Sequence, residues 1–351
     1  MCAYQGAAPG ACVLVVRDGA PIICRAYGLS DLENRVPATP ATNYRLASMT
    51  KQFTAAAILL VMQDGRLAVD DPARKWLPAL PDAANAITIR QLLTHTSGLI
   101  DYEELIADGT PAQLRDADVL RLLESQNRTY FAPGAGYRYS NSGYSLLASI
   151  VGRASGRDFA SFLRERIFEP LHMRNTLAYE EGISTVAHRA YGYCAPNSSR
   201  ISAAQAWQRA DQSATSAVLG DGGIYSSIDD LAKWDAALYD DRLLKTESLR
   251  LAFSPVTKTD DPAVQYGFGW RISGETLWHS GETMGFRNVI LRYPRQRFTV
   301  IVLTNRDQPE TYSVALAIAN IFLPDADAVH AANSVSGPDS GAKPLPNSSR
   351  P

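Results

Sequence analysis

Strand-forming segments lie at both ends of this 351-residue chain and enclose a long helical middle. Near the N-terminus, apolar and β-branched segments at 11–16 and 21–27 flank the turn Arg17-Asp18-Gly19. Near the C-terminus, strand patterns recur at 267–272, 277–281, 286–293 and 298–303. The middle shows helical periodicity instead, at 53–64, 119–125, 143–152 and 228–238. Because a sheet must bury its apolar face, we expect the two ends to form one sheet.

This order of elements predicts an α+β fold. An antiparallel β-sheet, built from about 10–47 and 264–322, is flanked by helices, and a mainly helical region of about 52–250 is inserted between its segments. We expect a single domain over 1–325, with a last helix covering the sheet and a site in the cleft between the two parts. Residues 326–351 are rich in Pro, Ser, Gly and Ala, which predicts a disordered tail.

Composition excludes several classes of function. A net charge of −2, with 46% hydrophobic and 20% charged residues, gives no basic field for nucleic acid. The longest apolar stretch, 55–62, is much shorter than the roughly 20 residues of a membrane-spanning helix. The first ten residues lack the basic and apolar parts of a signal peptide. This predicts a cytoplasmic protein if the start is genuine, and a periplasmic or secreted one if it is truncated.

The cysteines do not indicate a metal site. Cys2, Cys12, Cys24 and Cys194 lack the paired short spacing of zinc ligands, so we expect neither a metal nor a cofactor. A two-residue hairpin at 18–19 would pair Cys12 with Arg25, and Cys24 with Val13. This register places the two thiols on opposite faces of the sheet, which argues against a disulfide between them and favours a reducing compartment.

A serine and a lysine three residues apart are the first candidates for chemistry. Ser48 and Lys51 lead into an apolar helix that starts near Phe53. Positions three apart on a helix share a face, so Ser48 Oγ and Lys51 Nζ can meet. A desolvated lysine can lose its proton and then activate a serine nucleophile. The spacing alone is weak evidence, because it recurs in the tail at Ser340 and Lys343.

Two further motifs could complete a site. Tyr139-Ser140-Asn141 follows a glycine-bearing loop, which would present a phenol and an amide to a cleft. His279-Ser280-Gly281 lies on an expected strand, where the histidine would supply a polar or cationic group at the cleft edge, and Gly281 would let the substrate backbone approach. Each motif alone is better explained by packing or by helix capping.

The three motifs together resemble a known family. Ser-x-x-Lys, Tyr-x-Asn and His-x-Gly, in this order and separated by 91 (139 − 48) and 140 (279 − 139) residues, resemble the penicilloyl-serine superfamily of serine β-lactamases, penicillin-binding DD-peptidases and related esterases. The blocks YRLASMTKQFTAAAILLVMQDGRLAVDDP, ITIRQLLTHTSGL, APGAGYRYSNSGYSLL, GDGGIYSS and WHSGETMGFRN resemble its class C β-lactamase-like branch. The resemblance covers about residues 10–322.

The resemblance implies a serine hydrolase that forms an acyl-enzyme on Ser48. Lys51 and Tyr139 would share the proton transfers, and Asn141 would bind the acyl side chain of the substrate or hold Lys51. The implied oxyanion hole consists of the backbone N–H groups of Ser48 and Glu282. His279, Ser280 and Gly281 would help to bind the substrate.

One departure from the family pattern narrows the expected substrate. β-Lactamases usually carry Lys-Thr-Gly where this chain has His279-Ser280-Gly281, so the lysine charge that docks a β-lactam carboxylate is missing. We therefore expect a carboxylesterase, a D-amino-acid peptidase or a DD-carboxypeptidase with at most weak β-lactamase activity. The substrate is a small ester, a D-peptide or a β-lactam-like molecule.

The alternative from another class is a penicillin-recognising binding or sensor protein that is acylated without efficient turnover. Two other features resemble structural elements of the family rather than catalytic ones: His95 in the block Thr94-His95-Thr96-Ser97-Gly98, and the glycine run 220–223 near the cleft.

Overall fold

The computed structural model describes residues 4, 6–107, 112–195 and 207–324. Its strands are β1 (Ala11–Arg17), β2 (Ala20–Tyr27), β3 (Leu29–Asp31), β4 (Val36–Pro37), β5 (Tyr44–Arg45), β6 (Leu177–Ala178), β7 (Tyr193–Cys194), β8 (Gln208–Arg209), β9 (Ile224–Ser226), β10 (Thr257–Lys258), β11 (Gln265–Tyr266), β12 (Arg271–Ser273), β13 (Thr276–Thr283), β14 (Phe286–Tyr293) and β15 (Phe298–Thr304). Its α-helices are α1 (Lys51–Gln63), α2 (Ile89–Leu93), α3 (Asp116–Glu124), α4 (Asn141–Ser155), α5 (Phe159–Leu163), α6 (Leu219–Gly222), α7 (Ile228–Ala237), α8 (Thr246–Phe253) and α9 (Thr311–Phe322). Short helical turns include η2 (Ala47–Thr50), η5 (Tyr102–Leu105) and η6 (Arg164–Phe168).

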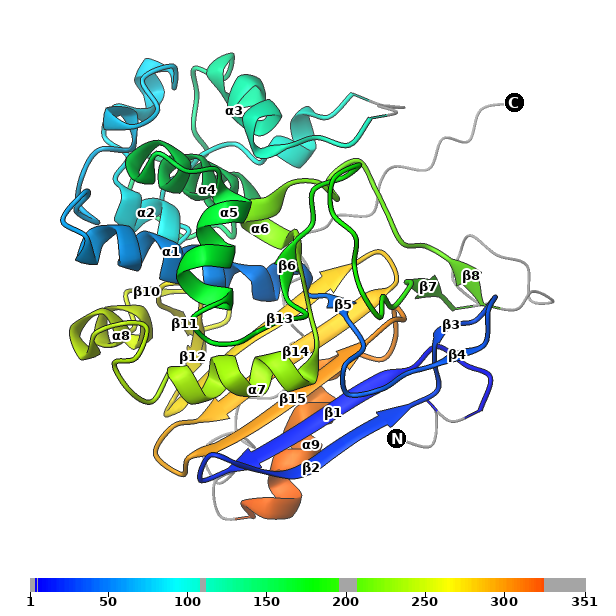
Figure 1. The fold of residues 1–351 in the computed structure, drawn as a ribbon. Helices are drawn as coiled ribbons and strands as arrows, with labels where there is room; N and C mark the ends of the chain where they lie inside the picture. The colour runs from blue at the N-terminus through cyan, green and yellow to red at the C-terminus, as the bar shows by residue number, and fades with distance from the viewer. Residues whose placement is uncertain (1–3, 5, 108–111, 196–206, 325–351) are drawn as a thin grey trace.

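The main sheet joins both ends of the chain, as the sequence predicts. Its strand order is β10-β11-β12-β13-β14-β15-β1-β2, and every neighbouring pair is antiparallel. The N-terminal hairpin therefore pairs with β15 from the other end of the sequence, and the helical region lies over one side of the sheet (Figure 1). The α+β fold class is confirmed. The strand expected at 267–272 is shorter, because a turn at 267–270 separates β11 from β12.

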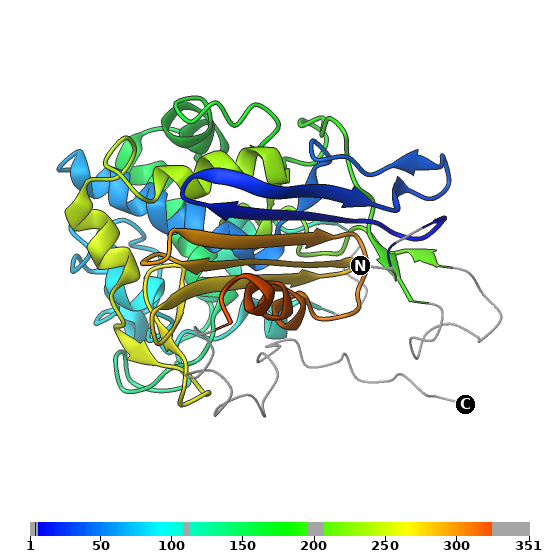
Figure 2. The ribbon, with the colours of Figure 1, turned by 90° about the horizontal axis from the view of Figure 1, so that it is seen from below.

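Alternating side chains of the sheet enter two separate cores. In β1, Cys12 and Leu14 join the large core under the helical region, whereas Val13 and Val15 join a smaller core on the opposite face. The helix α9 covers that second core and packs against β14 and β15, as Figure 2 shows from below. The strands of β14 and β15 are buried on both faces for this reason.

The expected register of the first hairpin is wrong beyond its turn. The pairs Arg17–Ala20 and Val16–Pro21 agree with a two-residue turn, but a bulge between Val15 and Val16 shifts all later pairs by one residue. Cys12 therefore pairs with Ala26, and Cys24 pairs with Leu14. Since Cys12 and Leu14 share a face, both thiols point toward the helical region rather than to opposite faces. Both cysteines carry free thiols.

The helix α1 is the centre of the helical region. All of its residues from Lys51 to Val61 are buried, and it packs against α4, α5 and α6. Such an all-round burial explains the uninterrupted apolar run in the sequence. No helix within the described ranges is long and apolar enough to cross a membrane. The disordered tail predicted at 326–351 lies outside the described residues.

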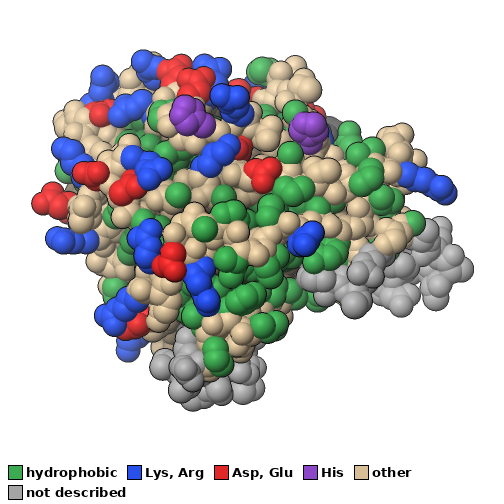
Figure 3. Space-filling model, turned by 60° about the horizontal axis from the view of Figure 1, so that its bottom comes forward, with side chains coloured by type: hydrophobic (Ala, Val, Ile, Leu, Met, Phe, Trp, Pro, Cys, Tyr) green, Lys and Arg blue, Asp and Glu red, His purple; other side chains and the backbone are tan. Residues whose placement is uncertain are grey.

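The surface differs between the two parts of the fold. Figure 3 shows hydrophobic side chains gathered across the middle of one face, with most Lys, Arg, Asp and Glu side chains at its margin. The strand β2 forms one edge of the sheet, and its Ile22 is 44% exposed.

Candidate active site

Ser48 lies on a strained turn between β5 and α1. Ala47 has a φ of +50°, a left-handed conformation that is rare for a residue with a side chain. Asn288 of β14 donates a hydrogen bond from Nδ2 to the carbonyl of Arg45 over 2.8 Å, which ties this turn to the sheet. Ser48 is half-buried, whereas Lys51, one turn later at the start of α1, is fully buried. The strained backbone thus presents Ser48 to solvent while Lys51 stays inside.

The side-chain nitrogen of Lys51 has three hydrogen-bond partners. Its Nζ lies 3.1 Å from Ser48 Oγ, 2.8 Å from Asn141 Oδ1 and 2.9 Å from the carbonyl oxygen of Asp221. The rings of Tyr139 and Tyr144 lie beside it, with centroids 4.9 and 5.5 Å from Nζ. The structure therefore brings Ser48, Lys51, Tyr139 and Asn141 together, although they lie in separate parts of the sequence.

Glu103 fixes the orientation of the Asn141 amide. Asn141 Nδ2 donates to Glu103 Oε1 over 3.0 Å, so its Oδ1 must face Lys51. Of the two roles expected for Asn141, this hydrogen bond fits the holding of Lys51. Glu103 itself is exposed, although the neighbouring protein partly desolvates its carboxyl group and so raises its pKa.

A buried carboxyl group lies behind Lys51. Asp221, in α6, accepts a hydrogen bond from Tyr102 OH at Oδ2 over 2.9 Å, and its side chain is buried. Burial raises the pKa of Asp221 to about 8; the Lys51 charge opposes this shift, and the acids Asp116 and Glu103 add to it. Asp116 in turn accepts the backbone N–H groups of Leu219 and Gly220. The glycine run 220–223 is thus anchored next to Lys51.

His279 is buried and neutral, so of the two states expected for it, polar or cationic, the structure favours the polar one. Its Nδ1 lies 2.6 Å from the carbonyl oxygen of Ser280, which can only accept a hydrogen bond, so Nδ1 carries the proton. Its Nε2 then accepts a hydrogen bond from Tyr266 OH over 2.9 Å. Burial lowers the pKa of His279 well below its ordinary value, and the charges of Arg271 and Lys51 lower it further.

Gly281 is required by the fold itself rather than only by a substrate. A Cβ atom at this position would lie 1.9 Å from the carbonyl oxygen of Leu46, at the start of the turn that carries Ser48. The strand β13 therefore packs directly against η2. β12 pairs with β13 only as far as Trp278 of β13. Beyond that residue, β13 pairs with β14 alone. The side chain of Glu282 lies on the same face as Ser280, since Ser280 Oγ donates to Glu282 Oε1.

Arg271 is the cation nearest to Tyr139 on the sheet side. Its guanidinium carbon lies 5.6 Å from the Tyr139 ring centroid and 5.3 Å from that of Trp278. Arg271 is 6% exposed.

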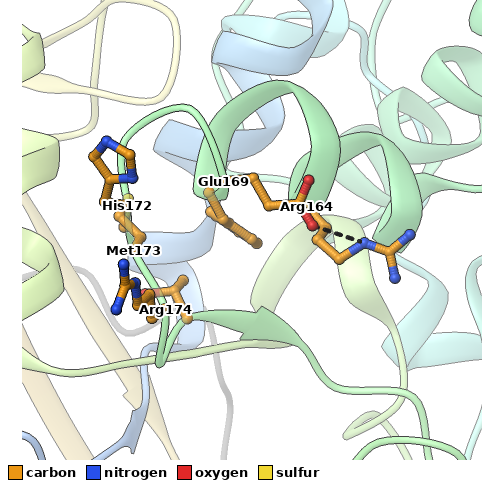
Figure 4. Close-up of a pocket in the computed structure, with 7 residues that line it drawn as sticks. Arg164, Glu169, His172, Met173 and Arg174 are labelled. Carbon is orange, nitrogen blue, oxygen red and sulfur yellow. Dashed lines mark ion pairs between the residues drawn. The ribbon is translucent and has the colours of Figure 1, made fainter.

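A separate surface hollow does not contain these residues. It has a volume of about 290 Å³ and is lined by Arg164, Phe168, Glu169, His172, Met173, Arg174 and Thr176. Figure 4 shows the ion pair between Arg164 and Glu169 at its wall. None of the residues that surround Lys51 contributes to this hollow, so we do not assign the chemistry to it.

Sequence reasoning did not find several residues around Lys51. Glu103, Tyr102, Tyr266 and Arg271 belong to no short motif, and only the packing of η5, β11 and β12 brings them near the site. In the sequence, Asp221 stands out only as part of the glycine run 220–223. An acidic residue within an otherwise apolar and glycine-rich block was the one available signal for it.

Comparisons with known proteins give one consistent result. The sequence model of the family described as Beta-lactamase matches residues 2–322. Penicillin-binding protein 4* of Bacillus subtilis (strain 168) is 32% identical over 316 residues, which cover 87% of this chain and 70% of that protein. D-aminopeptidase of Gluconobacter oxydans (strain 621H) is 29% identical over 306 residues, but this alignment covers 85% of this chain and only 56% of the enzyme.

A solved structure agrees with these sequence matches. The octameric penicillin-binding protein homologue from Pyrococcus abyssi superposes with a TM-score of 0.80 at 26% identity. The match covers 90% of this chain and 74% of that chain.

Proposed function

This chain belongs to the beta-lactamase family of serine hydrolases, and from that premise we propose that it cleaves a small amide or ester through a covalent acyl-enzyme on Ser48. The observation that carries the proposal is the hydrogen bonding of Lys51. A neutral lysine keeps two N–H bonds, which Asn141 Oδ1 and the Asp221 carbonyl can both accept. The remaining lone pair of Nζ then points at Ser48 Oγ, 3.1 Å away. Lys51 is therefore arranged to act as a general base.

The reaction proceeds in two steps. Ser48 Oγ attacks the substrate carbonyl carbon as its proton passes to Lys51, and the oxyanion accepts the N–H groups of Ser48 and Glu282. The bond to the leaving group then breaks, and Tyr139 supplies the proton that the leaving amine or alcohol takes away. In the second step a water attacks the ester on Ser48 as Tyr139 takes its proton, and Lys51 returns its proton to Ser48 Oγ, which releases the acid and restores the serine.

The backbone of β13 supports the oxyanion assignment. The contact between Gly281 and the turn at Leu46 brings β13 against η2, which carries Ser48. In this proposal His279 and Ser280 bind the substrate as part of the edge of β13. The imidazole of His279 contributes only to the shape of that edge. Since His279 is neutral, it supplies no cation for a β-lactam carboxylate, which supports weak β-lactamase activity at most.

Glu103 favours a substrate with a free ammonium group. Its carboxylate is exposed and lies 3.0 Å from Asn141, next to the atoms that would hold the acyl part of the substrate. A D-amino-acid amide or a D-peptide carries its ammonium group one atom from the scissile carbonyl carbon, within reach of such a carboxylate. The similarity to a protein named D-aminopeptidase supports the same substrate class. We therefore place D-aminopeptidase or amidase activity ahead of carboxylesterase and DD-carboxypeptidase activity.

The acyl-enzyme is tested with Ser48→Ala. Purified wild-type protein should hydrolyse D-alanyl p-nitroanilide and bind a serine-reactive fluorophosphonate covalently, and Ser48→Ala should do neither. Labelling that persists in this variant would remove Ser48 as the nucleophile. Acylation of the wild type without turnover of any amide, ester or cephalosporin would instead favour the penicillin-recognising binding or sensor protein.

The substrate class is tested with Glu103→Gln. This variant keeps an oxygen that accepts from Asn141 but loses the charge, so kcat/KM for D-alanyl p-nitroanilide should fall by about tenfold, as for the loss of one charge-assisted hydrogen bond. Turnover of the N-acetylated substrate should not change. Glu104→Gln is the matched control, because Glu104 is adjacent and pairs with Arg138 instead. An equal loss on both substrates would contradict ammonium recognition.

A further inference from the structure

We propose that His95 is a positioning residue for Tyr139. It binds the residues before and after Tyr139 and packs against the Tyr139 ring. This inference rests on the proposed function of Tyr139. The two residues are 44 positions apart in the sequence (139 − 95), and His95 lies in a loop without regular structure. His95 makes one contact with the Tyr139 ring and two with its neighbours, Arg138 and Ser140.

His95 binds both backbone neighbours of Tyr139. The carbonyl oxygen of His95 accepts the N–H group of Arg138 over 3.0 Å, and its Nδ1 accepts the N–H group of Ser140 over 3.1 Å. One residue therefore fixes the peptide groups on either side of the phenol. His95 makes both contacts from a backbone with a φ of +60°, which is rare for a residue with a side chain.

The imidazole ring also packs on the phenol. The ring centroids of His95 and Tyr139 are 4.3 Å apart at an interplanar angle of 36°. Tyr266 and Tyr144 surround the other sides of the imidazole, at 4.5 and 5.1 Å. His95 is fully buried, so the Tyr139 ring rests on a packed aromatic layer rather than on solvent.

Neighbouring residues of the two loops reinforce this arrangement. Gly134 N–H donates to the carbonyl of Thr96 over 2.8 Å, and Tyr130 N–H donates to that of Gly98 over 2.7 Å. Gly98 has a φ of +71°, and a Cβ atom there would lie 2.3 Å from the carbonyl oxygen of Phe131. The block 95–98 therefore holds the loop before Tyr139 in position.

The chemical state of His95 fits positioning rather than proton transfer. Because Nδ1 accepts an N–H group, the proton is on Nε2, and that atom finds no hydrogen-bond partner within the described residues. Burial, with the charges of Lys51 and Arg271, lowers the pKa of His95 well below its ordinary value. The imidazole therefore stays a neutral acceptor throughout the neutral pH range.

Two substitutions separate the contacts. His95→Phe keeps a ring under Tyr139 but loses the acceptor for Ser140, whereas His95→Asn keeps an acceptor near Nδ1 and loses the ring. A misplaced catalytic group can cost about 100-fold, so we expect kcat for D-alanyl p-nitroanilide to fall by roughly 10- to 100-fold in His95→Phe with little change in KM. His95→Asn should recover part of this loss. Thermal unfolding of each variant serves as the check for folding, and His95→Gln, which also moves the acceptor, replaces His95→Phe if that variant does not fold.

A double-mutant cycle distinguishes positioning from a general structural role. If His95 acts through the Tyr139 hydroxyl, the substitution at His95 should change kcat by less than about threefold in a Tyr139→Phe background. An equal factor in both backgrounds would overturn the inference and leave the proposed function intact. A wild-type kcat in Tyr139→Phe alone would instead refute the proposed role of Tyr139, and the inference about His95 with it.

Discussion

The two sides of the candidate site differ in charge. On the helical side, Asn141 Oδ1 and the carbonyl oxygen of Asp221 face Lys51 Nζ, and Glu103 accepts a hydrogen bond from the Asn141 amide. On the sheet side, β13 contributes a neutral His279 and a glycine that fits under the Ser48 turn. In the proposed mechanism, proton transfer therefore belongs to the helical side, and the strand β13 supplies backbone groups and shape.

The largest expected loss of activity is at Lys51, on the helical side of the site. Lys51→Met removes the proposed base and its three hydrogen bonds, so kcat/KM should fall by at least about a thousandfold. Steady-state kinetics with D-alanyl p-nitroanilide measures this loss. Lys75→Met, at an exposed lysine paired with Asp71, is the control and should be fully active. Substantial activity in Lys51→Met would move the proton transfer away from this side.

The next effect concerns the shape of the sheet side. Gly281→Ala would place a methyl group 1.9 Å from the Leu46 carbonyl oxygen, which neither strand nor turn can accommodate without a shift. Overpacking of this kind costs about 1–3 kcal/mol of unfolding free energy, and the displaced Ser48 turn should lower kcat as well. Urea denaturation and kinetics give both quantities.

Gly152→Ala is the matched control for that experiment. Its added methyl group would meet only the carbonyl oxygen of Arg157, which lies 3.4 Å away, beyond the end of α4. An active and stable Gly281→Ala would show that the strand does not need to approach Leu46 so closely.

A third prediction uses the pH dependence of stability. Burial raises the pKa of Asp221 in the folded protein to about 8 from an ordinary value of 3.8, so the folded form binds the proton more tightly. The contribution of this residue is fully present below pH 3.8 and is lost as pH rises toward 8. The unfolding free energy of the wild type should therefore fall relative to that of Asp221→Asn over this range, by up to about 1.4 kcal/mol per pH unit.

Urea denaturation from pH 4 to 9 measures the difference between the two proteins. Asp241→Asn, at an exposed residue, should run parallel to the wild type over the same range. A difference between wild type and Asp221→Asn that does not change with pH would mean that the carboxyl group stays ionised in the folded protein.

The smallest effect is expected at His279. His279→Gln keeps a hydrogen-bonding group near Tyr266 and removes no charge, because the imidazole is neutral. We expect kcat/KM to change by less than about fivefold, as for one neutral hydrogen bond, with no shift of its pH profile. A profile that loses an ionisation would show that His279 titrates during turnover, and the contrast between the two sides would fail.

The sequence alone determined the elements and the motif positions. The apolar run of α1, the hairpin turn at Asp18-Gly19 and the strands β13 to β15 follow from local patterns, because periodicity and turn residues act over short distances. The three-residue spacing between Ser48 and Lys51 required a helical turn, and the structure has one there, although it begins as a 3₁₀ turn rather than as an α-helix.

Only the tertiary structure decided what surrounds these motifs. The neutrality of His279 depends on its burial and on the charge of Arg271, the orientation of Asn141 depends on Glu103, and the shared face of Cys12 and Cys24 depends on a single bulge. Burial and long-range hydrogen bonds set protonation states, and a one-residue shift reverses the face of every later side chain in a strand. Neither effect leaves a local signal, because each arises from residues that the fold brings together from distant parts of the chain.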